Sequence, residues 1–155
     1  MVNKRRTIEL DYEEIRKLLR TERVLQVASI NKDGTPHLVS MWFALEEDGS
    51  LVFTTYGRSQ KVKNLERDPR VTLLVESGER YDELKGVMVD GIAEIIRDPS
   101  QTANVMELTR LKDLNLGLER KFPRKVENEL PPAAYKRVVV KILPKRYRSW
   151  DHGKI

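Results

Sequence analysis

The sequence predicts a mainly β domain with an antiparallel sheet and flanking helices. Two short turns carry this prediction, because Asp33-Gly34 lies in the turn 32–36 and Asp48-Gly49 in the turn 47–50. Each turn separates stretches rich in β-branched, aromatic and other apolar residues, which strands favour. Strands joined by turns this short pair antiparallel, and this excludes a doubly wound parallel sheet. At 155 residues the chain suits one domain, 1–155, with a proper core.

The first helix is expected over Asp11–Glu22. Asp11 suits the N-cap position, and Glu14, three residues on, completes a capping box. Apolar residues recur at helical spacing and are expected to pack against the sheet; they are Tyr12, Ile15, Leu18 and Leu19.

Three strands are expected next, each bounded by turn residues, and they cover Val24–Asn31, His37–Leu45 and Leu51–Thr55. In the first of them Leu25, Val27 and Ser29 alternate onto one face. The third strand leads into the stretch around which the chain is organised, LVFTTYGRSQKVKNLERDPRVTLLVE, which predicts strand, loop, short helix and strand.

The short helix of this stretch is bounded by two residues with special backbones. Gly57 precedes it and can take a conformation that other residues avoid, and Pro69 prevents its continuation. Val62 and Leu65 share its inward face.

The other face of the same helix is polar and suits an anion. Arg58, Lys61 and Asn64 lie together on it. A helix N-terminus leaves N–H groups unpaired and carries partial positive charge, and Ser59 can act as N-cap and as hydroxyl donor. Arg58 can bind two phosphate oxygens and Lys61 adds a mobile charge. A solvated basic helix that crosses a sheet edge is the alternative interpretation. Thr54 and Thr55 end the preceding strand and strengthen the case for a phosphate site, because strand ends followed by helix starts are frequent ligand sites.

The second half predicts further strands and one helical region. Strands are expected over Val71–Val75, over 86–96 with a bulge at Gly91, and over Val138–Leu143. Asp98-Pro99 begins a helical insertion of about 98–132, with an apolar stripe at Val105, Leu108, Leu111 and Leu118 and a basic cluster at Lys121, Arg124 and Lys125. Residues 145–155 are expected to form a tail.

Composition narrows the partners and the compartment. Net charge is +5, with 34% charged and 39% hydrophobic residues, and basic residues alternate with acidic ones. This favours a small anionic ligand over nucleic acid. No apolar run approaches the roughly 20 residues of a membrane span, and no apolar segment follows the basic N-terminus. Because no membrane span is found, we expect no membrane partner. Because the chain has no cysteine, we expect a cytoplasmic protein.

The sequence lacks the residues that several kinds of catalysis require. Two histidines without cysteine make no transition-metal set, so no metal is expected. Ser149, Asp151 and His152 are too close in sequence to converge as a hydrolase triad, and neither a Walker loop nor GxGxxG follows a strand. Paired carboxylates for acid/base work do not stand out. Hydride chemistry on a bound cofactor fits what remains, because the cofactor then carries the reactivity.

Two tryptophans leave alternatives open. Trp42 either fills the core or walls a pocket for a flat heterocycle that the backbone of its strand contacts. Trp150, among basic residues, either plugs the core or lies over a ligand, including one held by a neighbouring subunit.

The assembled segments resemble the pyridoxamine-5′-phosphate-oxidase-like split β-barrel family, and most closely its branch that uses the deazaflavin coenzyme F420 in place of FMN. The likeness rests on DGTPHLVSMWF, TTYGRSQKVKNLERDPRVTLLVE, YDELKGVMVDGIAEI and KRVVVKILPKRYRSWDHGKI, in the family's order and over more than half of the chain. The SQKxxNLxRDPRV run is specific to the superfamily, and the terminal SWDH supports the F420 branch.

The resemblance implies a six-stranded antiparallel split barrel of the FMN-binding type, acting as a homodimer with two cofactor sites at its interface. It implies no protein residue in the role of catalytic base, since the substrate takes hydride directly from the reduced ring. The cofactor-binding positions that it implies are the phosphate motif, the strand beneath the ring, the strand reading the pyrimidine edge, and a terminal residue: Arg58, Ser59, Gln60, Lys61, Asn64, Thr54, Thr55, Ser40, Met41, Trp42 and Trp150.

Three hypotheses follow. The first is an F420-dependent oxidoreductase acting on small unsaturated organic molecules, with Lys63, Arg67 and residues 121–125 as candidates to bind the polyglutamate tail. The second is an FMN-dependent oxidase or reductase on the same scaffold. The third is a non-catalytic cofactor carrier, or a basic barrel that binds nucleic acid.

Overall fold

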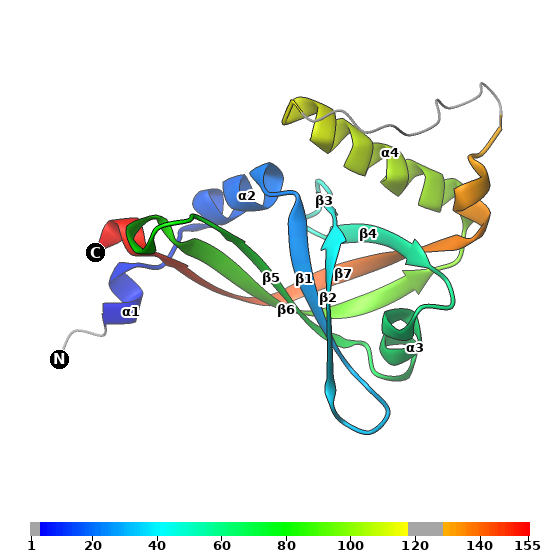
Figure 1. Cartoon of the computed structure of the whole chain (residues 1–155), viewed down its shortest axis with the longest axis horizontal. Coiled ribbons are helices and arrows are strands. Elements are labelled where there is room, and N and C mark those ends of the chain that lie inside the picture. The colour runs from blue at the N-terminus through cyan, green and yellow to red at the C-terminus, as the bar shows by residue number, and fades with distance from the viewer. Residues whose placement is uncertain (1–3, 118–128) are drawn as a thin grey trace.

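One antiparallel sheet forms the body of the protein in a computed structural model that describes residues 4–117 and 129–155 (Figure 1). Within these residues the sheet has seven strands, in the order β2-β1-β5-β6-β7-β4-β3. Their bounds are β1 Val24–Ile30, β2 Pro36–Trp42, β3 Ala44–Leu45, β4 Leu51–Tyr56, β5 Arg70–Ser77, β6 Lys85–Ile96 and β7 Arg137–Asp151.

The sheet curls into a split barrel. β2 and β3 stand at opposite ends of the strand order, yet only the buried Phe43 separates them in sequence. The two ends of the sheet therefore meet at this residue. The expected strand over 37–45 is broken there, and this accounts for seven strands in place of the expected six.

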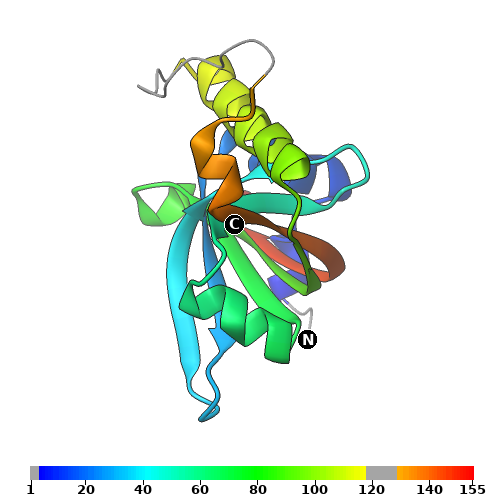
Figure 2. The ribbon, with the colours of Figure 1, turned by 90° about the vertical axis from the view of Figure 1, so that its right-hand side faces the viewer.

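The helices lie around this sheet (Figures 1 and 2). α2 covers one part of the barrel, α4 lies across β3 and β4, and α3 closes the opposite end. The bounds of the helices are α1 Lys4–Thr7, α2 Tyr12–Thr21, α3 Gln60–Arg67 and α4 Pro99–Asn115, with short 3₁₀ turns at Tyr81–Glu83, Pro132–Tyr135 and His152–Lys154.

Local sequence signals place most of these elements correctly. Asp11 caps α2, with the reciprocal Asp11–Glu14 capping box. Asp98 caps α4, and the register between β6 and β7 shifts at Asp90/Gly91, where the bulge was expected. Gly34, in the β1–β2 turn, has a φ of 85°, the left-handed conformation that glycine allows.

The buried face of α4 differs from the expected stripe. Leu108 and Leu111 are 40% and 42% exposed, and Leu118 lies outside the described residues. The buried residues are Thr102, Val105, Thr109 and Asp113. Thr102 and Thr109 donate their hydroxyls to the carbonyls four residues back, so they can be buried without an unsatisfied donor.

Two other expectations were wrong. Tyr12 is 57% exposed, whereas the other three members of the α2 stripe are buried. Residues 145–151 are strand, because β7 continues in register with β6 as far as Asp151↔Lys85. Gly57 does not use the conformational freedom that glycine allows, since its φ is not positive. The absence of a side chain at Gly57 matters for packing instead, because a Cβ at this position would lie only 3.2 Å from Cγ1 of Val138.

The C-terminal end of α4 is tied to α2 by a half-buried lysine. Lys112 Nζ donates to the Leu19 carbonyl at 2.9 Å and lies 3.5 Å from the centroid of the Phe43 ring. Burial lowers the pKa of Lys112 to about 7. No helix of the described ranges is long and apolar enough to cross a membrane.

Candidate functional site: an anion-binding helix end

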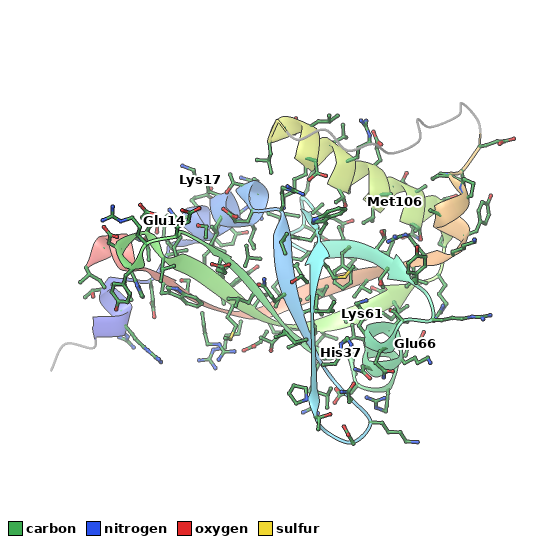
Figure 3. All side chains as sticks on the ribbon, in the orientation of Figure 1. Glu14, Lys17, His37, Lys61, Glu66 and Met106 are labelled. Carbon is green, nitrogen blue, oxygen red and sulfur yellow. The ribbon has the colours of Figure 1, made fainter. Side chains whose placement is uncertain are left out.

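The start of α3 meets the end of β4 at one end of the barrel. Val62 and Leu65 are buried and hold the helix on the sheet, as their spacing predicted. Asp68 ends the helix before Pro69. Figure 3 shows Lys61 and Glu66 on α3, well away from Glu14 and Lys17 on α2.

Lys61 is buried at this junction. Its Nζ donates to Thr55 Oγ1 at 3.0 Å, and its residue is 9% exposed. Burial lowers the pKa of Lys61, and the positive charge of Arg137 lowers it further. No carboxylate of the described residues forms an ion pair with Lys61. A buried cation without a countercharge is costly, and an anion would relieve that cost.

Further donor groups occur at the start of the same helix. Ser59 occupies the N-cap position without a side-chain capping hydrogen bond, and its hydroxyl lies 3.5 Å from Thr55 Oγ1. The first backbone N–H groups of α3 are therefore not satisfied by this side chain. Arg58 is exposed beside them. Ammonium, hydroxyl, guanidinium and helix N-terminus together form a site suited to phosphate.

Asn64 has a different position within the same motif. It is fully buried, and its Nδ2 donates to Ser29 Oγ at 3.1 Å and to Asn31 Oδ1 at 2.9 Å. Its Oδ1 accepts from Gln60 Nε2 at 2.9 Å and from Arg67 at 3.3 Å. These contacts use the whole hydrogen-bonding capacity of the amide, so Asn64 joins α3 to β1 and positions Gln60.

The expected ring-contacting residues lie on β2. This strand ends the sheet order, so one of its edges carries backbone N–H and C=O groups that no neighbouring strand pairs. Ser40 and Trp42 face outward, with Trp42 44% exposed, whereas Met41 packs against the core. The Arg23 guanidinium lies 5.7 Å from the centroid of the Trp42 ring.

Trp150 lies far from the helix end. It pairs with Gly86, whose added Cβ would lie 2.6 Å from the indole, so the ring lies against the glycine backbone. Arg137 and Trp150 stand at opposite ends of β7, roughly 40 Å apart at the ordinary rise per residue. Within one chain the structure therefore brings Thr55, Ser59 and Lys61 together, and it leaves Trp150 apart from them.

Register nevertheless places Trp150 on the same face of the sheet as Ser40. One row of paired residues crosses that face from β2 to β7, and it consists of Ser40, Gln26, Leu74, Met88 and Arg148. Trp150 lies two residues beyond Arg148, and Trp42 two residues beyond Ser40, so both indoles belong to this outward face.

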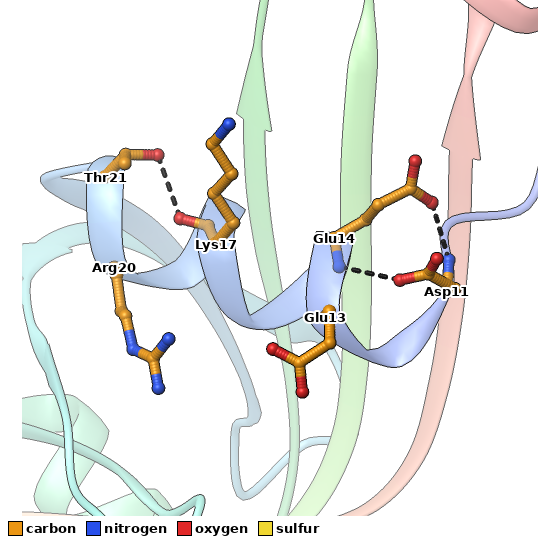
Figure 4. A pocket seen from close by; sticks show the side chains of 6 residues that line it. All are labelled: Asp11, Glu13, Glu14, Lys17, Arg20 and Thr21. Atoms are coloured by element: carbon orange, nitrogen blue, oxygen red, sulfur yellow. Dashed lines mark hydrogen bonds between the residues drawn. The ribbon is translucent and has the colours of Figure 1, made fainter.

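Two hollows in the described residues lie elsewhere. One follows the outer side of α2 (Figure 4), where Asp11 and Glu14 cap each other and the Thr21 hydroxyl donates to the Lys17 carbonyl. Another lies between α4 and the sheet near Val105 and Lys141. Lys61 lines neither of these two hollows.

Sequence reasoning missed Arg137. Its NH1 donates to the Thr54 carbonyl at 3.3 Å, and its guanidinium carbon lies 4.7 Å from the centroid of the Tyr56 ring. It reaches the site because Arg137 pairs with Tyr56 across β7 and β4. No local signal announces this pairing; a basic residue at the start of the last strand was the only hint.

The nominated tail-binding residues are also placed differently. Arg67 donates to the Ile30 carbonyl and to Asn64, so it fastens the β1–β2 hairpin to α3. Lys63 is exposed on the outer side of α3. Residues 121–125 lie outside the described residues. No cluster of metal-ligating side chains occurs in the part of the chain that the structure covers.

Comparison with known proteins agrees with the fold. A conserved hypothetical protein of Mycobacterium tuberculosis is 36% identical, with a TM-score of 0.82 over 96% of this chain and 89% of that one. A structure named F420 reductase is 25% identical, with a TM-score of 0.64 over 84% and 93%. A FAD-binding protein of Mesorhizobium loti is 22% identical, with a TM-score of 0.67 over 90% and 94%, and shows likeness of fold.

The search of curated proteins found no match. The model of the family described as pyridoxamine 5′-phosphate oxidase matches residues 12–151. This match covers the split barrel from α2 to the end of β7, and the chain accordingly belongs to the pyridoxamine 5′-phosphate oxidase family.

Proposed function

We propose that the protein is an F420-dependent oxidoreductase that transfers hydride from the reduced deazaflavin to a small unsaturated organic substrate. The observation that carries the proposal is the buried, uncompensated Lys61 at the start of α3, 3.0 Å from Thr55. The family membership supports redox chemistry on a flavin-like cofactor. When bound, the reduced deazaflavin would supply the hydride.

The residues of the chain divide the binding task. Lys61, Arg58, Ser59 and the first N–H groups of α3 would hold the phosphate, because they are cationic or donor groups without a carboxylate partner. The free edge of β2 offers backbone donors and acceptors to a planar heterocycle, and Thr54 and Thr55 would lie beneath it. No catalytic acid or base is assigned among these residues, and a reaction in which the cofactor carries the reactivity needs none.

Coenzyme F420 is favoured over FMN by two observations. The structure named F420 reductase resembles this chain over 84% of its length at 25% identity. Lys63 also provides an exposed cation on α3, beyond the phosphate group, where a polyglutamate tail could be bound. FMN, which lacks such a tail, remains the alternative cofactor on the same scaffold.

A homodimer would complete the site. The outward face of β1 and β2 carries Leu38, Trp42 and Val24, which are 68%, 44% and 36% exposed. Such a patch favours association with a second copy. Because Trp150 shares this face, packing of two copies through it would carry the indole of one chain toward β2 of the other. This supports Trp150 as a cofactor contact in trans.

The test is a titration of the purified full-length protein with F420 and with FMN, followed by reduced F420 and a panel of conjugated small molecules. We expect saturable F420 binding that Lys61→Met weakens, and oxidation of reduced F420 that depends on substrate. Tight FMN binding with negligible F420 binding would promote the flavin alternative. Binding of neither cofactor would refute the proposal.

A further inference from the structure

Arg137 differs from six other arginines of the described residues in how its guanidinium is used. Those six form ion pairs with carboxylates, and they are Arg23, Arg70, Arg80, Arg97, Arg110 and Arg148. No such pair is formed by Arg137 within that part of the chain. Its contacts are one carbonyl and one aromatic ring, which hold it in place without neutralising it.

The direction of this side chain follows from the register of β4 and β7. Gly57 N donates to the Lys136 carbonyl, so Gly57 and Lys136 form a hydrogen-bonded pair. In an antiparallel ladder the alternate residues turn their backbone groups to the other edge, and Thr54 is one of these. The Arg137 guanidinium therefore crosses β4 to reach the Thr54 carbonyl on the edge away from β7.

That edge of β4 is open where Arg137 arrives. β3 pairs with β4 only at Leu51 and Val52, so no strand covers the edge at Thr54. Thr55, next along the strand, accepts from Lys61. The charge of Arg137 is also near enough to lower the pKa of Lys61. Two like charges are thus held close together at the end of one strand.

Keeping two uncompensated cations together costs free energy unless an anion lies between them. The Tyr56 ring limits the rotation of the guanidinium, and one N–H is used by Thr54. The guanidinium has five N–H donors, so its remaining ones are available to oxygen atoms of an anion in the bidentate geometry that arginine favours.

We propose that Arg137 is a third cationic ligand of the phosphate site, and that Tyr56 is the positioning residue that aims it. The ligand class is a phosphate ester, held jointly by Lys61 from the helix and Arg137 from the last strand. This deepens the proposed function and rests on it for the identity of the cofactor. The presence of an anion site does not depend on that identity.

The first experiment measures binding of inorganic phosphate to full-length wild type, R137Q, R137K and K136Q by calorimetry. Lys136 is the matched control, because it is the exposed neighbour and its replacement changes the charge equally. We expect the phosphate affinity of R137Q to fall about tenfold or more, as for the loss of a charge-assisted bidentate contact. K136Q should lose about twofold at most, as for an exposed charge. The phosphate affinity of R137K should lie between those of wild type and R137Q, because lysine restores the positive charge but not the bidentate geometry of the guanidinium.

The pH dependence of the same binding separates contact from general structure. Removing the Arg137 charge should raise the pKa of Lys61, so the alkaline decline of residual phosphate binding in R137Q should shift to higher pH. Y56L should weaken phosphate binding, and adding R137Q to Y56L should cost less than R137Q alone. Equal affinities of R137Q and K136Q, or an unshifted alkaline decline, would overturn the proposal.

Titration with F420 and FMN keeps the two proposals distinct. Phosphate binding that depends on Arg137, without binding of either cofactor, would sustain the anion site and refute the proposed function. F420 binding that is equally tight in wild type and R137Q would sustain the function and remove Arg137 from the site.

Discussion

Lys61 and Thr55 are joined by a hydrogen bond of 3.0 Å between two side chains that are 9% and 3% exposed. The bond links the first turn of α3 to the last residues of β4. A cation in such a position normally costs stability, because its water is lost and no carboxylate replaces it. Stability and binding should therefore respond to Lys61 in opposite directions.

Lys61→Met should retain or raise the free energy of unfolding while cofactor affinity falls by about 1.5–3 kcal/mol, the range of a charge-assisted hydrogen bond. The methionine fills similar space without the buried charge. Chemical denaturation and a binding titration measure the two quantities. Lys17→Met, at an exposed lysine of α2, should change neither by more than about 0.5 kcal/mol. A fall in stability together with unchanged affinity would assign Lys61 a purely structural role.

Asn64→Leu should destabilise the fold by about 2 kcal/mol or more, because Ser29 and Asn31 lose their buried donor and Gln60 loses its acceptor. Equilibrium unfolding in urea checks this value. Gln60→Ala, at the exposed end of the same network, is the control and should cost much less. Comparable losses in the two variants would contradict the central position of Asn64.

The wild-type protein should sediment with about twice the 18.1 kDa chain mass, with or without cofactor. Leu38→Asp should shift the population toward monomer, because it places a charge in the centre of the outward β1–β2 face. Leu111→Asp on α4 introduces the same charge at another exposed leucine and should leave the mass unchanged. Dissociation by the α4 variant alone would move the interface to that helix.

Gly86→Ala should displace the Trp150 ring, since the new Cβ would lie 2.6 Å from it. We expect a red shift in tryptophan fluorescence and a loss of stability of about 1–3 kcal/mol, as for overpacking. Trp150→Ala in the same background should recover part of that loss, because the clash disappears. Additive losses in the double variant would show that the two residues act independently.

The free energy of unfolding should rise with pH above about 7, the pKa of the half-buried Lys112 in the folded protein. The unfolded chain regains the ordinary value of 10.5, so between these two pH values it binds a proton that the folded protein does not. Below this window both states are protonated and the contribution is constant. Contact with the Phe43 ring favours the charged amine, but burial has the larger effect.

Unfolding curves of wild type and Lys112→Met from neutral to alkaline pH check this window. In Lys112→Met the increase of the free energy of unfolding with pH should disappear. In Lys17→Met, at an exposed lysine of α2, this increase should be retained. Parallel pH profiles for wild type and Lys112→Met would contradict the inference.

Local chemistry was enough to predict much of this fold. The Asp11 and Asp98 caps, the turn at Gly34 and the bulge at Gly91 depend on a few neighbouring residues, so their signals lie within short windows. The candidate phosphate motif is equally local, because Ser59 and Lys61 lie at the start of one helix, and its role stays a prediction.

Pairing over long sequence distances could not be predicted in the same way. The extension of β7 to Asp151 depends on Lys85, and the position of Arg137 depends on Tyr56. On α4 the apolar pattern misled, since threonines whose hydroxyls bond to their own helix occupy the buried side while Leu108 stays exposed. Which residues of α4 are buried depends on the surface of the sheet against which the helix packs. The periodicity of the helix sequence carries no information about that surface.

The pairing of β4 also determines the order in which the protein can fold. β4 has only the two-residue β3 as a neighbour until β7 is available, and Thr54 and Arg137 are 83 positions apart. Contacts so distant in sequence slow folding, because the intervening loop must close first. On the ribosome the first hairpin and α3 can form early, whereas β4 keeps an unpaired edge until β7 has been synthesised. The strand that would carry the proposed anion site thus exposes an unpaired edge during synthesis, and such an edge needs protection from aggregation.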